Sequence, residues 1–109
     1  MRLTFLTLMG FAKKANKIVY GMSNCQNAVR KDKAKLVIIT ADAGKNRKKI
    51  IRECQSLNIP FLEYGNKDLF LRSIGNPACY WAVLSQGIAV ELMREFEKEK
   101  VRDKPKWGD

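Results

Sequence analysis

The chain has 109 residues, which is enough for one domain with a buried core, and it carries a formal net charge of +10. It contains no histidine, so the usual general base at neutral pH and the commonest metal ligand are both missing. We therefore expect a non-enzymatic protein with no cofactor and no metal site. The three cysteines, Cys25, Cys54 and Cys79, lie far apart among apolar residues and predict reduced core thiols in a cytoplasmic protein.

The positive charge is concentrated in the first half of the chain. Residues 1–52 contain thirteen lysines and arginines against two acidic residues, whereas residues 53–109 contain eight basic and nine acidic residues. A field this uneven attracts polyanions, so nucleic acid is the expected partner, with an anionic membrane surface or an ordinary solvated face as alternatives. The sequence shows no transmembrane span, and its apolar start continues into lysines in a manner typical of a helix rather than a signal peptide.

The first third of the chain predicts two helices separated by a short strand. Apolar residues at helical spacing predict a first helix over residues 3–16, which Thr4 is placed to cap. The apolar residues 18–20 predict a brief edge strand. A second stretch of helical periodicity predicts a helix over residues 22–31.

A run of aliphatic residues at positions 35–40 does not alternate with polar residues and predicts an interior strand that is covered on both faces. Asp42 is placed to cap a third helix that ends at Leu57. Further along the chain we expect a strand, a small helix, a loop, a second apolar strand and a last helix, over residues 61–64, 67–74, 75–77, 79–84 and 85–98.

The near alternation of helices and strands predicts an α/β fold, a three-layer α/β/α sandwich around a small mixed, mainly parallel four-stranded sheet. Residues 1–98 form a single domain in this prediction. Residues 99–109 are charged, contain a proline and are expected to be a frayed tail.

The second predicted helix offers the clearest binding surface. Gly21 precedes it, and the free backbone N–H groups of its first turn can hold a phosphate or a base edge. Asn24 and Asn27 each carry an amide that can donate and accept, which is the chemistry needed to read a base. The alternative is that both amides solvate an ordinary helix face. Phosphate attraction nearby would come from the lysines at the end of the first helix, Lys13, Lys14 and Lys17.

Several segments resemble the ribosomal protein family named L-seven-Ae and L-thirty-e, which binds kink-turn RNA. The segments that carry this resemblance are residues 21–30 (GMSNCQNAVR), 34–39 and 41–42. Others are similar to the short bacterial, YlxQ-like members of the family, namely residues 8–15, Lys17 and residues 58–61. The resemblance covers residues 6–96 and implies an RNA-binding protein of the bacterial translation machinery. Its expected partner is structured, ribosomal RNA rather than DNA or a membrane, and we expect a cytoplasmic monomer.

In that family, the N-terminus of the second helix and an apolar loop before the last strand bind RNA. The resemblance therefore implies RNA contacts at Lys17, Gly21, Met22, Ser23, Asn24, Asn27, Arg30, Lys31, Asp42, Lys67, Gly75, Asn76, Pro77 and Ala78. Kink-turn binders carry Asn, Glu and Lys at three of these positions, where this chain has Ser23, Asn24 and Asn27. Because amides replace a guanine-reading carboxylate and a phosphate-binding ammonium, we expect weakened kink-turn specificity.

Two other functions remain open from the sequence. One is a substrate-binding module that works with an RNA-modifying enzyme, since similar folds precede such catalytic domains. The other is a protein-interaction module whose basic face meets an acidic partner. Copurifying nucleic acid and its salt sensitivity would separate the RNA-binding function from the second alternative.

Overall fold

The computed structural model describes residues 4–103, and side chains are described through Glu99. This part of the chain forms five helices and four strands. In chain order they are α1 (Phe5–Lys14), β1 (Ile18–Tyr20), α2 (Met22–Arg30), β2 (Leu36–Ile39), α3 (Arg47–Ser56), β3 (Phe61–Glu63), α4 (Lys67–Ile74), β4 (Tyr80–Val83) and α5 (Gln86–Asp103). Thr4 caps α1 as predicted, since its hydroxyl oxygen accepts from the Thr7 N–H at 3.2 Å.

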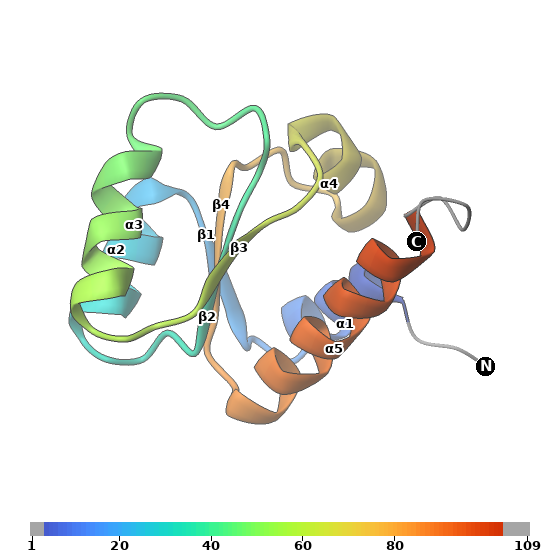
Figure 1. The fold of residues 1–109 in the computed structure, drawn as a ribbon, viewed down its shortest axis with the longest axis horizontal. Coiled ribbons are helices and arrows are strands. Elements are labelled where there is room, and N and C mark those ends of the chain that lie inside the picture. The colour runs from blue at the N-terminus through green and yellow to red at the C-terminus, as the bar shows by residue number, and fades with distance from the viewer. Residues whose placement is uncertain (1–3, 104–109) are drawn as a thin grey trace.

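The four strands form one mixed sheet in the order β1, β4, β2, β3. β4 is antiparallel to both of its neighbours, with Trp81 opposite Tyr20 and Ile38, whereas β2 and β3 are parallel. The predicted sandwich around a mixed four-stranded sheet is confirmed, but the expected majority of parallel pairings is wrong. β4 runs antiparallel because of the connection that precedes it. α4 lies at the end of the sheet where β3 stops, so β4 begins at that end and runs in the opposite direction (Figure 1).

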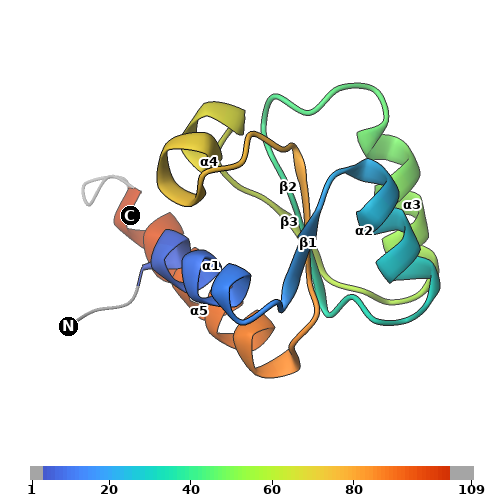
Figure 2. The same ribbon diagram turned by 180° about the vertical axis from the view of Figure 1, so that it is seen from behind.

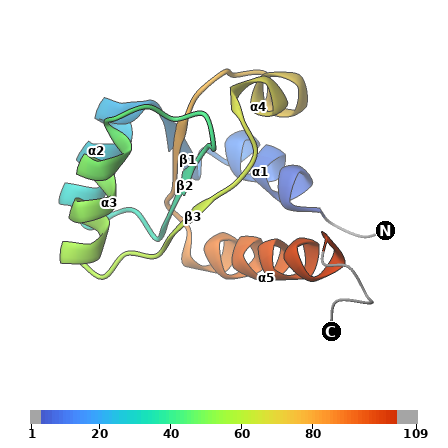
Figure 3. The ribbon, with the colours of Figure 1, turned by 45° about the horizontal axis from the view of Figure 1, so that its top comes forward.

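Helices cover both faces of the sheet. Figures 1 and 2 show α2 and α3 on one face, α1 and α5 on the other, and α4 beside one end of the sheet. In Figure 3, α1 lies between α4 and α5. One hydrophobic cluster, which includes Phe5 and Trp81, fills the space under α1 and α5, and a second, which includes Val29 and Ile50, fills the space under α2 and α3. All four residues of β2 are buried, as the uninterrupted apolar run predicts.

Two of the three cysteines lie in the core, as predicted. Cys25 and Cys54 are buried, Cys79 is half-buried, and all three are free thiols. Burial raises the pKa of Cys25 to about 12 and the pKa of Cys54 to about 11, so both stay protonated at neutral pH. Within residues 4–103, no three His, Cys, Asp or Glu side chains are placed to hold a metal ion. No helix of the same range has the length and apolar character needed to cross a membrane.

The third helix begins later than predicted. α3 starts at Arg47, and Asn46 takes the N-cap position without a side-chain hydrogen bond. The prediction that Asp42 caps this helix is wrong, since residues 41–46 form a turn and the Asp42 carboxylate binds the start of α4 instead. Leu57, the residue at which this helix was predicted to end, is 46% exposed because it follows the last helical turn.

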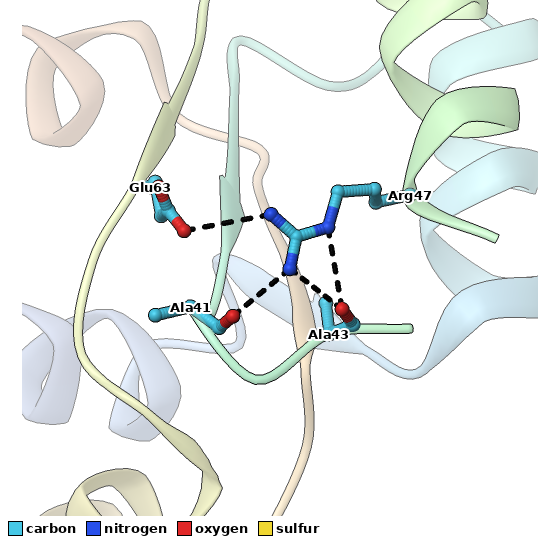
Figure 4. A network of polar contacts seen from close by, with 4 residues as sticks. All are labelled: Ala41, Ala43, Arg47 and Glu63. Atoms are coloured by element: carbon cyan, nitrogen blue, oxygen red, sulfur yellow. Dashed lines mark hydrogen bonds and ion pairs between the residues drawn. The ribbon is translucent and has the colours of Figure 1, made fainter. Parts of the chain in front are cut away.

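The Arg47 guanidinium explains why this turn replaces the first helical residues. Its Nη2 donates to the carbonyl oxygens of Ala41 and Ala43 at 2.9 and 2.6 Å, and its Nη1 pairs with Glu63 of β3 at 3.5 Å (Figure 4). These bonds satisfy carbonyl groups that a helix would otherwise have used. Arg47 thereby connects the turn between β2 and α3 to β3.

The last helix extends beyond its predicted end. Glu95 within it is only 6% exposed, and its Oε2 accepts from Lys98 at 3.2 Å. The helix continues to Asp103, so the predicted tail boundary at residue 99 falls inside α5, and the Glu99 carboxylate accepts from the Tyr64 hydroxyl at 3.0 Å. Both carboxylates lie on the side of α5 that packs against the domain. The rest of the predicted tail, residues 104–109, lies outside the described residues.

Candidate functional site

Three of the four strands end at the same end of the sheet. β1, β2 and β3 run in one direction, because β1 and β2 are each antiparallel to β4 and β3 is parallel to β2. The N-terminus of α2, the turn 41–46, the start of α4 and the loop 75–78 all lie at this carboxyl end of the sheet (Figure 1). Ligands of open α/β sheets bind outside the carboxyl ends of the strands, which makes this end the candidate site.

The N-terminus of α2 is open to solvent. Gly21 occupies its N-cap position with φ of 93° and ψ of 148°, a conformation that residues with side chains rarely adopt, and no side chain caps the helix. The Gly21 N–H donates to the Tyr80 carbonyl oxygen at 2.9 Å, which fixes the start of α2 beside β4. No acidic residue lies in the first turn, so its N–H groups and the positive end of the helix dipole are available to an anion.

The Asn24 side chain folds back onto β1. Its Nδ2 donates to the Tyr20 carbonyl oxygen at 3.0 Å, while the residue as a whole stays exposed. This bond uses one of the two N–H groups of the amide, so Asn24 can still present Oδ1 as an acceptor and the second N–H as a donor at the open end of α2. Ser23 beside it is also exposed, and Met22 is half-buried.

Asn27 lies one turn further along the exposed side of α2. Together with Asn24, Lys31 and Lys33, it lines a shallow hollow of about 200 Å³ that has Val19 on its apolar side. The hollow thus combines two amides with two ammonium groups. A larger hollow of about 470 Å³ lies beside β3, but none of the predicted site residues lines it.

The loop before β4 is tied to α1 and β1. Lys13 of α1 donates from Nζ to the Ile74 carbonyl oxygen at 2.9 Å and also to the Asn76 Oδ1. The Asn76 Nδ2 in turn donates to the Tyr20 hydroxyl at 2.9 Å. These bonds hold the loop at a defined position next to the open end of α2.

The remaining residues of this loop have different environments. Gly75 ends α4 with a φ of 96°, the left-handed conformation that favours glycine. Pro77 is exposed, whereas Ala78 is buried and its carbonyl oxygen accepts from the Trp81 Nε1 at 3.0 Å. Of the two apolar side chains in the loop, Pro77 is therefore the one accessible to a ligand.

Sequence reasoning missed Tyr20, which connects the two halves of the site. Its carbonyl oxygen accepts from Asn24 on α2, and its hydroxyl accepts from Asn76 in the loop. An aromatic residue directly before Gly21 was the available signal. Lys13 was expected only to attract phosphate, and no feature of the sequence links it to Asn76.

Asp42 and Lys67 meet at the start of α4. Both Asp42 carboxylate oxygens accept from the Lys67 backbone N–H at 3.3 Å. The neighbouring Thr40 hydroxyl, followed by this N–H, holds the pKa of the Asp42 carboxyl below its usual range, so the group is ionised at neutral pH. The negative charge offsets the dipole of α4, which makes the N-terminus of α2 the better place for an anion.

Three predicted contacts lie away from the carboxyl end. Lys17 directly precedes β1 and therefore lies at the opposite end of this strand from Gly21. Its carbonyl oxygen accepts from the Leu84 N–H at 2.7 Å. Arg30 and Lys31 lie at the C-terminal end of α2, and the Arg30 Nε pairs with Glu53 of α3 at 2.6 Å. The predicted residues that the fold brings to the carboxyl end are Gly21, Met22, Ser23, Asn24, Asp42, Lys67, Gly75, Asn76, Pro77 and Ala78.

Many of the basic residues in the first half of the sequence gather on one face of the molecule. Exposed basic side chains occur on α2, α3 and the turns that precede and follow them: Lys31, Lys33, Lys45, Lys48, Lys49 and Arg52. Helix α5, on the other face, carries acidic residues, and two of its basic side chains are already paired with them, Arg94 with Glu91 and Lys98 with Glu95. A polyanion is therefore attracted to the α2 and α3 side of the molecule.

Comparisons with known proteins agree with this architecture. The sequence model described as the "Ribosomal protein L7Ae/L30e/S12e/Gadd45 family" matches residues 5–91. The protein named RNA-binding protein YlxQ of Bacillus subtilis (strain 168) is 35% identical over 88 residues, which cover 79% of this chain and 88% of the relative. A protein of the same name from Enterococcus faecium is 28% identical over 93 residues, which cover 84% of this chain and 90% of the relative.

Two solved structures have a similar fold. A protein with unknown function from Bacillus halodurans C superposes with a TM-score of 0.82 at 28% identity, covering 88% of this chain and 99% of the other. The Giardia lamblia 15.5kD RNA binding protein superposes with a TM-score of 0.68 at 23% identity, covering 85% of this chain and 84% of the other. The second match supports the fold alone, because its sequence identity is low.

Proposed function

The chain belongs to the ribosomal protein L7Ae/L30e/S12e/Gadd45 family, and we propose that it is a non-enzymatic protein that binds structured RNA at the carboxyl end of its sheet. The observation that carries this proposal is the open N-terminus of α2 beside the loop 75–78, with Tyr20 bonded to both. The relatives named RNA-binding protein YlxQ support RNA as the partner. The basic side formed by α2 and α3 supports it as well, because neutralising phosphates releases counterions.

Recognition would use two kinds of contact. The free N–H groups in the first turn of α2 bind phosphate oxygens, and Lys31 and Lys33 neutralise phosphates further along the helix. The Asn24 Oδ1 accepts from an amino or imino group on a base edge, while the bond from its Nδ2 to Tyr20 holds the amide in position. The phosphate contacts position the RNA, and the amide contributes the base-dependent part of the affinity.

Kink-turn specificity is weakened in this proposal. A carboxylate at position 24 would accept a charge-assisted hydrogen bond from a guanine, which is roughly twice as strong as a bond to a neutral acceptor. Asn24 keeps an acceptor at this place without the charge, and Asn27 supplies no ammonium. The protein should therefore bind structured RNA with less discrimination than a kink-turn reader.

We place the protein in the bacterial translation machinery, as a cytoplasmic monomer that binds ribosomal RNA. The description of the matching family as ribosomal proteins supports the process. The bacterial sources of the two YlxQ relatives support the bacterial setting. Crosslinking in cells, followed by sequencing of the attached RNA, tests this part of the proposal, and a target outside the ribosomal RNA would contradict it.

Titrations of a kink-turn RNA and an unkinked duplex of equal length, at one salt concentration, test RNA binding and specificity together. The wild type should bind both RNAs, and its affinity for both should fall as salt rises. Changing Ser23→Asn, Asn24→Glu and Asn27→Lys together should raise the preference for the kink-turn by roughly tenfold to a hundredfold, since a good base contact contributes about 1–3 kcal/mol.

A control variant separates this effect from a change in local charge. In this control, the exposed residues Gln55 and Ser56 at the end of α3 are changed to Gln55→Glu and Ser56→Lys, which introduces the same two charges at a different place. This control should leave the preference of the wild type unchanged. A wild type that binds neither RNA at low salt would refute RNA binding, whereas a wild type that already discriminates strongly would refute only the weakened specificity.

A further inference from the structure

We propose that three amino-end lysines, Lys17, Lys33 and Lys35, form a second contact for the phosphate backbone of the bound RNA. They lie at the end of the sheet opposite to the carboxyl end, since Lys17 directly precedes β1 and the other two lie in the connection between α2 and β2. This inference rests on the proposed function and extends its footprint. The RNA would follow α2 from its N-terminus to the amino-end lysines.

The fold brings the amino-end lysines together from two separate segments. The Lys17 carbonyl oxygen accepts from the Leu84 N–H at 2.7 Å, and the Lys35 N–H donates to the Val83 carbonyl oxygen at 2.7 Å. β4 thus lies between the two lysines, and their backbones are two strand spacings, or about 10 Å, apart. Figure 2 shows the connections α1–β1, α2–β2 and β4–α5 at this same end of the sheet.

One hollow connects this end of the sheet with the N-terminus of α2. Its lining includes Asn24 in the first turn of α2, Lys31 at the end of the helix, and Lys33 and Leu84 beyond it. Val19 lines it from β1, which is an edge strand of the described sheet, so a ligand can approach the hollow from the side. With nine residues, α2 is about 13 Å long, a distance that roughly four or five successive phosphates of one strand cover.

The charge at this end of the sheet is not neutralised within the domain. Among the side chains of residues 4–99, no carboxylate pairs with an amino-end lysine. The connections 15–17 and 31–35 together contain four lysines and one acidic residue, Asp32. No acidic residue lies in the first turn of α5, so the positive end of its dipole adds to the field. An extended anion such as a nucleic acid backbone therefore suits this surface.

The backbone that carries the amino-end lysines is fixed before any ligand binds. Besides the bonds of Lys17 and Lys35 to β4, the Lys33 N–H donates to the Ala28 carbonyl oxygen at 2.9 Å and holds the connection against the end of α2. Only the lysine side chains need to become ordered when a phosphate binds, which lowers the entropic cost of the contact.

Two double variants that lose equal charge test this contact. Lys17→Gln with Lys33→Gln removes two exposed amino-end lysines, whereas Arg72→Gln with Arg94→Gln removes two exposed charges from α4 and α5 as a matched control. The probe is a hairpin RNA with a central bulge and a long paired stem on each side of it. Fluorescence anisotropy at several salt concentrations measures affinity, and hydroxyl-radical footprinting measures which nucleotides the protein covers.

The amino-end double variant should lower the slope of log affinity against log salt by about 2, because each phosphate contact contributes about 0.9. Its affinity should fall by roughly 10- to 60-fold at about 0.1 M salt, and its footprint should become shorter by roughly four or five nucleotides at one end. Lys35→Gln alone should lower the slope by about 1. The arginine control should keep the slope and the footprint of the wild type.

Several results would overturn the second contact. Equal losses in the two double variants would do so, because overall charge would then account for them, and so would an unchanged footprint in the amino-end variant. Unchanged RNA affinity together with lost binding to vesicles that contain phosphatidylserine would assign the lysines to a membrane surface instead. Melting curves verify folding, and if the double variant is not folded, Lys17→Gln and Lys33→Gln decide separately. A wild type that does not bind the hairpin would overturn the proposed function itself.

Discussion

Replacing Lys13 by methionine should destabilise the protein by about 2 kcal/mol, whereas the same change at the neighbouring Lys14 should be almost neutral. The Lys13 ammonium donates to the Ile74 carbonyl oxygen at 2.9 Å and to the Asn76 Oδ1 in a part-buried position. A hydrogen bond from a charged donor contributes roughly 1.5–3 kcal/mol, and partial exposure to solvent lowers the sum for the two bonds to about 2 kcal/mol. Methionine keeps most of the apolar stem, so the loss reports the ammonium.

Urea and thermal unfolding of the two variants measure this difference. Both lysines lie in the last turn of α1, so their interaction with the helix dipole is similar and cancels in the comparison. Lys14 is exposed and makes no side-chain hydrogen bond with the side chains described, those of residues 4–99, or with their backbone. For a domain of this size, 2 kcal/mol corresponds to a lowering of Tm by roughly 8 °C. Equal Tm values for the two variants would refute the reasoning, as would a double-mutant cycle with Asn76→Ala that shows no coupling.

Three further perturbations test other parts of the structure. Trp81→Ala should lower the free energy of unfolding by about 3–5 kcal/mol in urea denaturation, because Trp81 is fully buried, and a loss below about 1 kcal/mol would contradict its place in the core. Hydrogen bonds from Arg30, then from Gln26, hold the pKa of Glu53 below its ordinary value, so its stabilisation is present near neutral pH and is lost as pH falls through the lowered pKa. The stability difference between wild type and Glu53→Gln is at most about 1 kcal/mol for this exposed pair. It should shrink as pH falls from neutral through the lowered pKa of Glu53, and a constant difference would argue against the pairing. Lys33→Glu should weaken RNA binding and reduce the slope of log affinity against log salt by about 1, whereas Arg94→Glu on α5 should change neither, and equal effects would contradict the charged-face argument.

The sequence by itself determined the elements whose signals are local. The uninterrupted aliphatic run located β2 as a buried interior strand, and the turn residues around positions 67–74 located α4 with its observed bounds. Thr4 was identified as the cap of α1 because a hydroxyl three residues before a free N–H is a local arrangement. The resemblance carried by residues 21–30 predicted the family that the comparisons show. It also pointed to the N-terminus of α2 and to the loop 75–78, which the fold places side by side.

Only the tertiary structure decided the direction of β4 and the polar contacts that shape the site. Periodicity reports which side of a helix is buried, but it does not report that Glu95 is enclosed or that Arg47 ends a turn by binding Ala43. Lys13 and Asn76 are 63 residues apart in the sequence. Their bond forms because α4 packs against α1, so the loop that follows α4 lies next to the C-terminal end of α1. Such contacts depend on how the elements pack together. Hydrophobic packing dominates the folding free energy and is non-directional, so the sequence around a polar residue does not indicate which distant polar residue it will meet.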